Sequence, residues 1–523
     1  MRNSPIALRT TPGYLMVAIA LAIAAWALVT AFTDWHPGAA IGIAIVVALL
    51  AVLSIQGSTL VEWIARTRRV THHSRPVTIT SRDGAAVVWD AHNALASCWI
   101  DITPAGQWPL TAVTSQGETS QPLVDLDMLA EMMRQDDIIV HRLALTTSGT
   151  RQATASRPAR IISQVVGATP THTSARTLLE VTVKMSESNA AAAARATQGS
   201  YVIGIQKTVL AAAARIVIRL KAQGLNAWIL GPGAVRNAAT DILNHVGAAS
   251  EHQAWKQLGG PGSTPAVVTA TPAGGRWDSA QQHEWLKTRT AHTFEHTFLE
   301  RSPSGAPQVA HLVSFVSPDS DTQIDGIDRN VGLNVLGGQQ AQAITRYMPL
   351  AASADLDVPQ VPLDEQMQLE THAGGLGVFL GTSPEDGKVF IRLDGNNTDP
   401  LWIIGPELLW RQFLQRVSLT DVTVDLQLDD PDGRWQAFVD HLDAPLITCG
   451  TNPDAAVIVT GEGTPHRPRQ GQSHIILTTT TPDPAPQYCV VATADQELVA
   501  ISGATSATMP WAMPGAERDL LDA

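Results

Sequence analysis

The chain of 523 residues contains few cysteines and a shortage of basic residues. Its three cysteines are Cys98, Cys449 and Cys489. An odd number at wide spacing does not build a disulfide framework, so we expect free thiols. There are 35 Lys and Arg residues against 48 Asp and Glu residues, a net charge of −13. Nucleic acid is therefore not an expected partner, because its phosphates require a basic surface.

Sequence motifs of common enzyme classes are also lacking. No G-x-S-x-G motif lies where a strand meets a helix, which argues against a nucleophile elbow. The segment "GTSPEDGKV", from Gly381 to Val389, approaches a phosphate-binding loop. However, five residues separate Gly381 from Gly387, and Val389 stands where a hydroxyl would bind Mg²⁺. We expect a hairpin turn there.

Two patterns raise the question of a metal ion. His292 and His296 have the spacing of a zinc helix, but Thr293 replaces the catalytic glutamate. The alternation in "AHTFEHTFLE" fits a strand with both histidines on one face. Two "DLD" triplets, at 125–127 and 355–357, would suit a divalent cation and a sugar-nucleotide diphosphate. The first is also placed to cap a helix, and we assign no metal, cofactor or catalytic residue.

Long apolar runs, in contrast, are present at the N-terminus. Residues 13–32 carry no charge, and at about 1.5 Å per residue they cross a hydrocarbon core of about 30 Å. Residues 38–60 form a second run, and "TDWHP", residues 33–37, separates the two. We predict two transmembrane helices joined by a short loop, since a signal peptide has no second span directly behind it. A buried helical hairpin in a soluble protein is the alternative.

Arginines predict the orientation of these helices. The loop contains only Asp34 and the weakly basic His36. Because positive charge is retained on the cytoplasmic side, we expect residues 1–12 and the C-terminus in the cytoplasm and the loop outside the inner membrane. Six arginines flank the two spans: Arg2, Arg9, Arg66, Arg68, Arg69 and Arg75.

Residues 61–150 are predicted to be a juxtamembrane segment followed by a small α/β subdomain. Period-two runs with turns at Asp83-Gly84 and near His92-Asn93 predict a meander. The stretch "PLVDLDMLAEMMRQDD" predicts a helix capped by Asp125 or Asp127. A strand, "DIIVHRLAL", follows, and the Ser/Thr/Arg-rich segment 146–160 is expected to be a linker or flexible loop.

Residues 151–503 are predicted to form an α/β cytoplasmic domain, and residues 504–523 a flexible tail. Strand "TLLEVTVKM", helix "YVIGIQKTVLAAAARIVIRLKAQG" and strand "LNAWIL" make a βαβ unit, which joins parallel strands. Later, strands "GLGVFLG", "KVFIRL" and "LWII" precede a helix opened by Pro406 and the strand "DVTVDL". The fold class is therefore two transmembrane helices followed by an α/β region with a mixed sheet.

Several segments in this order resemble the EccE family of the mycobacterial ESX, or type VII, secretion system. The resemblance is carried by "MRNSPIALR", "TDWHPGAAIGIAIVV", "RTRR", "CWIDITP", "LVDLDMLAEMM", "AAARIVIRLKAQGLNAWILG", "TAHTFEHTFLE" and "GLGVFLGTSPEDGKVFIRLDG". It implies a non-enzymatic subunit of an inner-membrane complex with EccB, EccC and EccD, of which EccC is the ATPase. It also implies a glycosyltransferase-like cytoplasmic domain.

The function predicted from the sequence is thus a membrane-anchored scaffold. Trp402, Trp410 and Trp435, if exposed, would be candidate contact residues, because aromatics are enriched in interface cores; core packing is the alternative for each. Two other functions stay open: a membrane-anchored, divalent-metal-dependent glycosyltransferase-like enzyme, and a membrane sensor whose cytoplasmic domain binds a small ligand.

Overall fold

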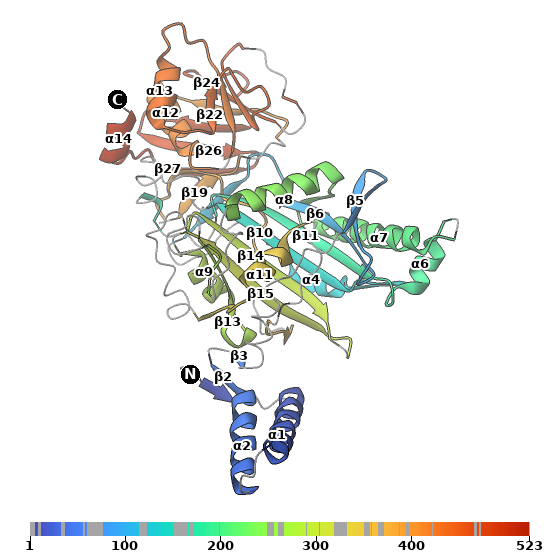
Figure 1. The fold of residues 1–523 in the computed structure, drawn as a ribbon. Helices are drawn as coiled ribbons and strands as arrows, with labels where there is room; N and C mark the ends of the chain where they lie inside the picture. The colour runs from blue at the N-terminus through green and yellow to red at the C-terminus, as the bar shows by residue number, and fades with distance from the viewer. Residues whose placement is uncertain are drawn as a thin grey trace.

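A computed structural model gives the fold of the chain (Figure 1). It describes residues 6–8, 12–32, 37–55, 58–59, 77–114, 123–150, 161, 165–167, 172–197, 199–247, 256–259, 266–288, 290–302, 304–317, 332–349, 356, 358–363, 371–385, 387–393, 397–420, 422–464, 468–469 and 472–521. Two sheets, each with its own hydrophobic core, make up most of this part of the chain.

The first sheet has eleven strands, and every pair of neighbours in it is antiparallel. Its main order is β16-β13-β15-β14-β10-β11-β6-β5-β4, while β12 pairs with β6 and β17 with β15. The strands are β4 (Thr78–Arg82), β5 (Ala85–Asp90), β6 (Leu95–Pro104), β10 (Arg142–Thr150), β11 (Ser174–Lys184), β12 (Leu225–Ile229), β13 (Val267–Pro272), β14 (His292–Arg301), β15 (Pro307–Val316), β16 (Leu333–Val335) and β17 (Val361–Pro362).

Helices cover both faces of this sheet (Figure 1). Ile216 of α7 packs in one core cluster with Ile100 and Val181, whereas Val235 of α8 packs with Trp99. Neighbouring residues of a strand point to opposite faces, so Ile100 and Trp99 place α7 and α8 on opposite sides. The helices are α4 (Leu126–Glu131), α6 (Asn189–Arg195), α7 (Tyr201–Ala222), α8 (Pro232–Val246), α9 (Ser279–Leu286) and α11 (Gln340–Tyr347), with a 3₁₀ turn, η2, at Ala273–Gly275.

The predicted strand–helix–strand unit is present as β11, α7 and β12, but its setting differs from the expectation. Both strands pair antiparallel with β6, so they run in the same direction with β6 between them. Helix α7 therefore connects two strands that run in the same direction but are not neighbours, and the sheet that it packs against is antiparallel. The meander is confirmed as β4–β6, and Asp83 and Gly84 at its first turn both have positive φ.

The second sheet has eight strands in the order β22-β21-β23-β24-β20-β25-β26-β27. Pairs from β22 to β25 are parallel, and β26 and β27 extend the sheet antiparallel, so it is a mixed sheet as predicted. Its elements are β20 (Leu401–Ile404), α12 (Glu407–Val417), β21 (Val424–Gln427), α13 (Arg434–Leu442), β22 (Ile447–Cys449), β23 (Val457–Gly461), β24 (Ser473–Thr478), β25 (Tyr488–Ala492), β26 (Glu497–Ser502), β27 (Thr505–Pro510) and α14 (Gly515–Leu521).

Two small sheets accompany the large ones. Strands β18 (Val378–Thr382) and β19 (Lys388–Ile391) form the hairpin expected around "GTSPEDGKV", and β7 (Leu110–Val113) pairs with β19. Strands β8 (Arg134–Gln135) and β9 (Ile138–Ile139) form a second hairpin. Strand β7 follows β6 of the first sheet along the chain, so the small sheet joins two parts of the chain that are far apart in sequence.

Two segments expected to be irregular are ordered elements. Residues 146–150 continue strand β10 and pair with both β11 and β14, while residues 151–160 lie outside the described part. The predicted boundary at residue 150 therefore falls between strands of one sheet. In the expected tail, β27 pairs with β26, and Glu517 of α14 is fully buried and forms an ion pair with Arg416, with Nε and Oε1 2.8 Å apart.

The N-terminal segment forms two apolar helices that lie side by side, α1 (Pro12–Phe32) and α2 (Pro37–Val52) (Figure 1). The second ends earlier than the predicted 38–60, because Leu53–Ile55 form strand β2, which pairs with β1 (Ile6–Leu8) and β3 (Ser58–Thr59). Loop residues 33–36 and the six flanking arginines lie outside the described residues.

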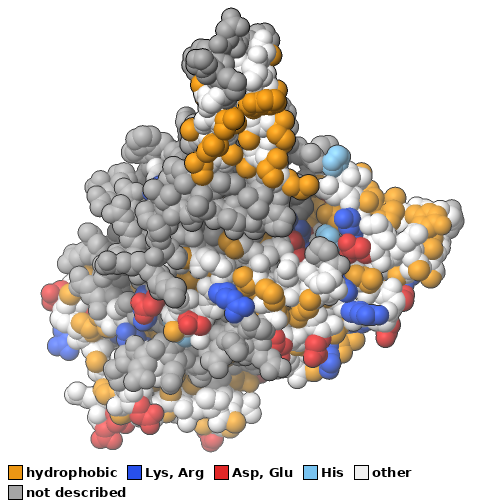
Figure 2. All heavy atoms as spheres, turned by 90° about the horizontal axis from the view of Figure 1, so that it is seen from below, with side chains coloured by type: hydrophobic (Ala, Val, Ile, Leu, Met, Phe, Trp, Pro, Cys, Tyr) orange, Lys and Arg blue, Asp and Glu red, His pale blue; other side chains and the backbone are white. Residues whose placement is uncertain are grey.

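Among the described residues, α7 is the one helix both long and apolar enough to cross a membrane. It is nevertheless a core helix of the first sheet, with Ile205, Val209, Ile216 and Leu220 fully buried. Shorter apolar helical stretches lie at Ala18–Ala31 and Gly38–Leu49. Many of their large apolar side chains are exposed, among them Ile19 at 59% and Leu28 at 63%, and Figure 2 shows the apolar side chains of the helical pair in orange.

Candidate functional site

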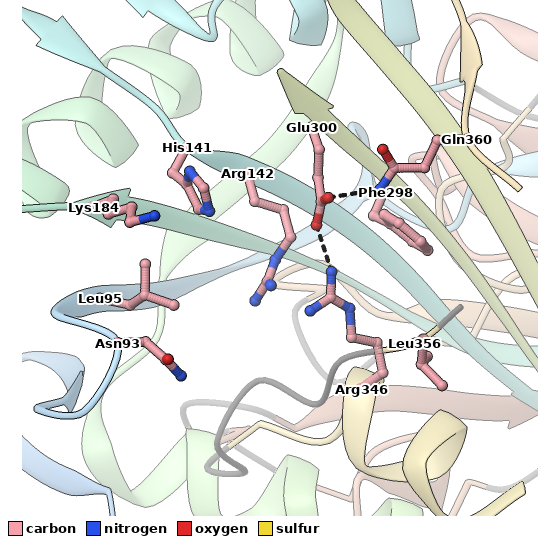
Figure 3. Close-up of a pocket in the computed structure, with 10 residues that line it drawn as sticks. All are labelled: Asn93, Leu95, His141, Arg142, Lys184, Phe298, Glu300, Arg346, Leu356 and Gln360. Atoms are coloured by element: carbon pink, nitrogen blue, oxygen red, sulfur yellow. Dashed lines mark hydrogen bonds and ion pairs between the residues drawn. The ribbon is translucent and has the colours of Figure 1, made fainter. Parts of the chain in front are cut away.

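A pocket of about 290 Å³ opens at one end of the antiparallel sheet (Figure 3). Its walls come from the turn between β5 and β6, the ends of β10, β11 and β14, helix α11 and the segment before β17. Ten residues line it: Asn93, Leu95, His141, Arg142, Lys184, Phe298, Glu300, Arg346, Leu356 and Gln360.

Strand register brings the charged side chains of the pocket to one face of the sheet. Arg142 lies opposite Glu300 on one neighbouring strand and opposite Thr182 on the other. Lys184 is two residues beyond Thr182 and therefore points to the same face. It lies opposite Leu95, which also lines the pocket. The charged strand ends thus meet although they are distant in sequence.

Two arginines in the pocket are held by half-buried carboxylates. Arg142 Nη2 donates to Glu180 Oε1 and Oε2 at 3.0 and 3.2 Å, and its side chain is 6% exposed. Arg346 Nη2 donates to Glu300 Oε1, and its guanidinium lies 5.1 Å from the centre of the Phe298 ring. Both side chains are therefore fixed before any ligand arrives.

Burial and neighbouring charges shift the pKa values of these groups. Burial and the adjacent Arg142 lower the pKa of Arg346 to about 10, while Glu300 and Glu180 counteract them. Burial raises the pKa of Glu180, but Arg142, Arg346 and hydrogen bonds to its side chain outweigh this effect and leave the pKa below its usual value. The two arginines are thus close enough to repel each other, and the carboxylates offset this repulsion at Arg346.

The remaining two basic residues differ from the arginines. His141 Nδ1 lies 3.0 Å from Glu187 Oε1, and burial lowers its pKa despite that carboxylate. Lys184 is half-buried at the end of β11. Within the part of the chain that the structure describes, Lys184 forms no ion pair.

The histidines singled out in the sequence lie on the same face of the sheet, on β14. The structure confirms the predicted strand, which excludes a zinc helix here. Thr146 Oγ1 lies 2.6 Å from His296 Nδ1, and Ser148 Oγ lies 2.8 Å from His292 Nε2. Burial lowers the pKa of both histidines well below the usual value, so they are neutral at pH 7. Among the described residues, no three His, Cys, Asp or Glu side chains are grouped to hold a metal ion.

The opposite face of β14 carries a buried pair that sequence analysis missed. Glu295 Oε1 accepts a hydrogen bond from Gln282 at 3.0 Å and lies 3.8 Å from His311 Nε2. Burial raises the pKa of Glu295 to about 7 and lowers that of His311 to about 3. The segment "HTFEHTFLE" could have indicated a buried glutamate, because Glu295 lies between Phe294 and Phe298 in a strand that is buried on both faces.

The other residues predicted for function are placed as follows. Asp125 caps α4 by accepting from the backbone N–H groups of Asp127 and Met128, whereas Asp355 and Asp357 lie outside the described residues. Trp435 is 8% exposed and belongs to the core of the second sheet, and Trp402 and Trp410 are half-buried. The three cysteines are free, as predicted.

Sequence analysis did not predict this pocket: Asn93 was named only as part of a turn, and Leu356 only as the middle residue of the second "DLD" triplet. Charged residues at the ends of apolar strands, such as Arg142, Lys184 and Glu300, were the available signal, but charged strand ends are common. Arg346 and Gln360 join them only through the packing of α11 and the segment before β17.

The fold and site define a class of protein: a mixed α/β body with two apolar N-terminal helices and a polar pocket, with no metal-binding group among the described residues. Residues 173–267 of the chain match the family model described as "EccE: Putative type VII ESX secretion system translocon, EccE". The segment contains β11, α6, α7, β12 and α8, so the resemblance to EccE is confirmed over a central part of the first sheet. No curated protein matches the chain.

Proposed function

We propose that this protein is a non-catalytic structural subunit of the inner-membrane type VII secretion complex, where it supports assembly or stability of the channel with EccB, EccC and EccD. The observation that carries the proposal is the EccE match over residues 173–267. That segment supplies a strand on each side of β6 and a helix on each face of the first sheet, so it forms a structural part of that sheet.

The two N-terminal helices support a membrane anchor. Their exposed apolar side chains, such as Met16, Ile23 and Leu28, are stabilised by lipid and would be costly in water. In this arrangement α1 and α2 cross the inner membrane with both ends of the chain in the cytoplasm, as the flanking arginines predict. The short β1–β2–β3 sheet lies where α1 begins and α2 ends.

The chemistry of the described residues also supports a non-catalytic role. The segment that approaches a phosphate-binding loop, Gly381 to Val389, is a hairpin between two strands. It therefore provides no helix N-terminus that could bind a phosphate. The buried histidines of β14 are neutral and hydrogen-bonded to hydroxyl groups. Asp125, a candidate for the alternative glycosyltransferase-like enzyme, is engaged in a helix cap.

Extraction of the tagged chain from its native membranes in mild detergent tests the proposal. We expect it to migrate on native gels in a megadalton-scale assembly, and mass spectrometry of that band to find EccB, EccC and EccD. Recovery as a monomer or small homo-oligomer in several mild detergents, with those three proteins intact elsewhere on the gel, would contradict the proposal.

A further inference from the structure

The pocket at the end of the antiparallel sheet has an excess of cationic groups on its walls. Arg142, Lys184 and Arg346 line it, whereas Glu300 is the one carboxylate among the ten lining residues. Glu180, which neutralises Arg142, lies on the adjacent strand and does not line the pocket. Once each arginine is matched with its glutamate, Lys184 is the third cationic group on the walls, and Glu187, which lies 3.0 Å from His141, is not among the lining residues.

These cations are aimed at one space. In Figure 3 the guanidinium groups of Arg142 and Arg346 approach each other from β10 and α11, and the amino group of Lys184 points toward the same region from β11. Two like charges this close in a poorly solvated site raise each other's energy, which contributes to the lowered pKa of Arg346. An anion beside them would relieve that repulsion.

We propose that this pocket binds a small molecule through an oxyanion, either a phosphate or a carboxylate. Arginine and lysine side chains recognise such groups by charge-assisted hydrogen bonds, which are stronger than neutral ones. Lys184 supplies a charge that forms no ion pair with a described residue, and the two arginines supply N–H groups held in place by Glu180 and Glu300. This inference goes beyond the proposed function, since a scaffold subunit does not need a small ligand.

The size and the other walls of the pocket limit what the rest of the ligand can be. About 290 Å³ lies at the lower end of the roughly 300–1,000 Å³ of small-molecule sites, which excludes a polymer chain. Phe298 and Leu356 provide an apolar surface, and the amides of Asn93 and Gln360 can bond hydroxyl groups. Gln360 Nε2 already donates to Glu300 Oε2 at 2.8 Å, which orients that amide. The ligand is therefore a small polar molecule that the pocket holds through one oxyanion group.

Calorimetric titration of the purified full-length protein in detergent tests the proposal, with inorganic phosphate in one series and succinate in another. Sodium chloride keeps the ionic strength constant, so that general screening does not imitate binding. The test variant is Lys184→Met, which removes the charge and keeps an aliphatic stem at the end of a strand. The matched control is Lys221→Met, at an exposed position near the end of α7.

We expect saturable binding of at least one of the two anions, with the tighter one identifying the oxyanion. Lys184→Met is expected to weaken it at least tenfold, whereas Lys221→Met leaves the dissociation constant unchanged. Absence of saturable binding of both anions, or equal affinity of the native protein and Lys184→Met, would overturn the proposal. Since no partner protein is present, either result is independent of assembly into a secretion complex.

Discussion

At the residue scale, the most unusual group is the buried carboxyl of Glu295 on β14. Its oxygen receives a hydrogen bond from Gln282, and His311 beside it is packed between Trp277 and Trp285, with ring centres 5.1 and 5.6 Å away. Burial favours the uncharged form of both partners, so the pKa of the acid rises and that of the imidazole falls. The pair is thus neutral over a range of pH in which both groups would be charged in water.

This shift predicts how stability depends on pH. Between the usual pKa of 4.5 and the folded value of about 7, Glu295 keeps a proton that the unfolded chain releases. The unfolding free energy therefore falls as the pH rises through this interval, by roughly 3 kcal/mol from this group. We expect Glu295→Gln, which stays neutral, to gain thermal stability relative to the native protein between pH 5 and pH 8.

The measurement is the melting temperature of both proteins across that pH range in one detergent. Glu284→Gln is the matched control, because Glu284 is an exposed carboxylate on α9, with a side chain 61% exposed. Melting curves of Glu295→Gln and the native protein that stay parallel at every pH would contradict the assignment.

At the element scale, regular patterns predicted structure well. The alternation over residues 292–299 predicted β14, and the helical spacing after Tyr201 predicted α7 with its buried Val209, Ile216 and Leu220. The failures have physical reasons. Residues 146–150 are rich in Ser and Thr and were expected to be a loop, but their hydroxyls bond side chains on neighbouring strands, so polar residues occupy a buried strand.

The error is the opposite one in the second apolar run, residues 38–60, where a helix was predicted and part of the segment forms a strand. Its hydrophobic composition continues past Val52, yet the backbone of residues 53–55 pairs with β1 in place of extending the helix. Composition indicates burial or lipid contact, but pairing with a distant strand decides the conformation. The same limit applies to β11 and β12, whose intervening partner β6 is far away in the sequence.

Contact between α6 and α7 depends on one glycine. A Cβ on Gly204 would lie 2.0 Å from the carbonyl oxygen of Ala192, which is backbone and cannot move away alone. We expect Gly204→Ala to lower the unfolding free energy by about 1–3 kcal/mol, because overpacking forces the two helices apart. Thermal unfolding of the purified protein measures this effect.

Gly233 on α8 is the control for this substitution. No atom lies within 4 Å of a Cβ built there, so Gly233→Ala should be neutral or slightly stabilising through the better helix propensity of alanine. Equal melting temperatures for the two alanine variants would show that the approach of α6 to α7 is looser than described.

At the scale of the whole molecule, the sequence predicted the parts better than their assembly. It indicated apolar helices followed by a mixed α/β body, but it did not indicate that β7 pairs with β19 or that the pocket gathers residues from Asn93 to Gln360. Contacts of this kind depend on tertiary packing, which leaves no periodic signal in one sequence.

Helices α1 and α2, the proposed anchor, are separate from the cores of the two large sheets, and this separation gives a prediction for the whole molecule. Among the side chains that the structure describes, the core clusters of the two sheets contain none from α1 or α2. We therefore expect a chain starting at Val77 to fold and to appear in the aqueous fraction when it is produced in a host without type VII secretion proteins. The full chain should stay with the membranes after an alkaline wash, and retention of the shortened chain there would contradict an anchor formed by α1 and α2.

The ion pair between Arg416 and Glu517 also sets the order in which the chain can mature. Arg416 Nη1 donates to the Phe379 and Leu380 carbonyls, but its charge is balanced by a glutamate 101 residues later. At synthesis rates of about 5–20 residues per second, that interval lasts on the order of 5–20 s. Until then the second sheet holds a buried cation without its counterion, which is costly. A truncated chain that ends before Glu517 is therefore expected to be unstable and to be degraded by proteases.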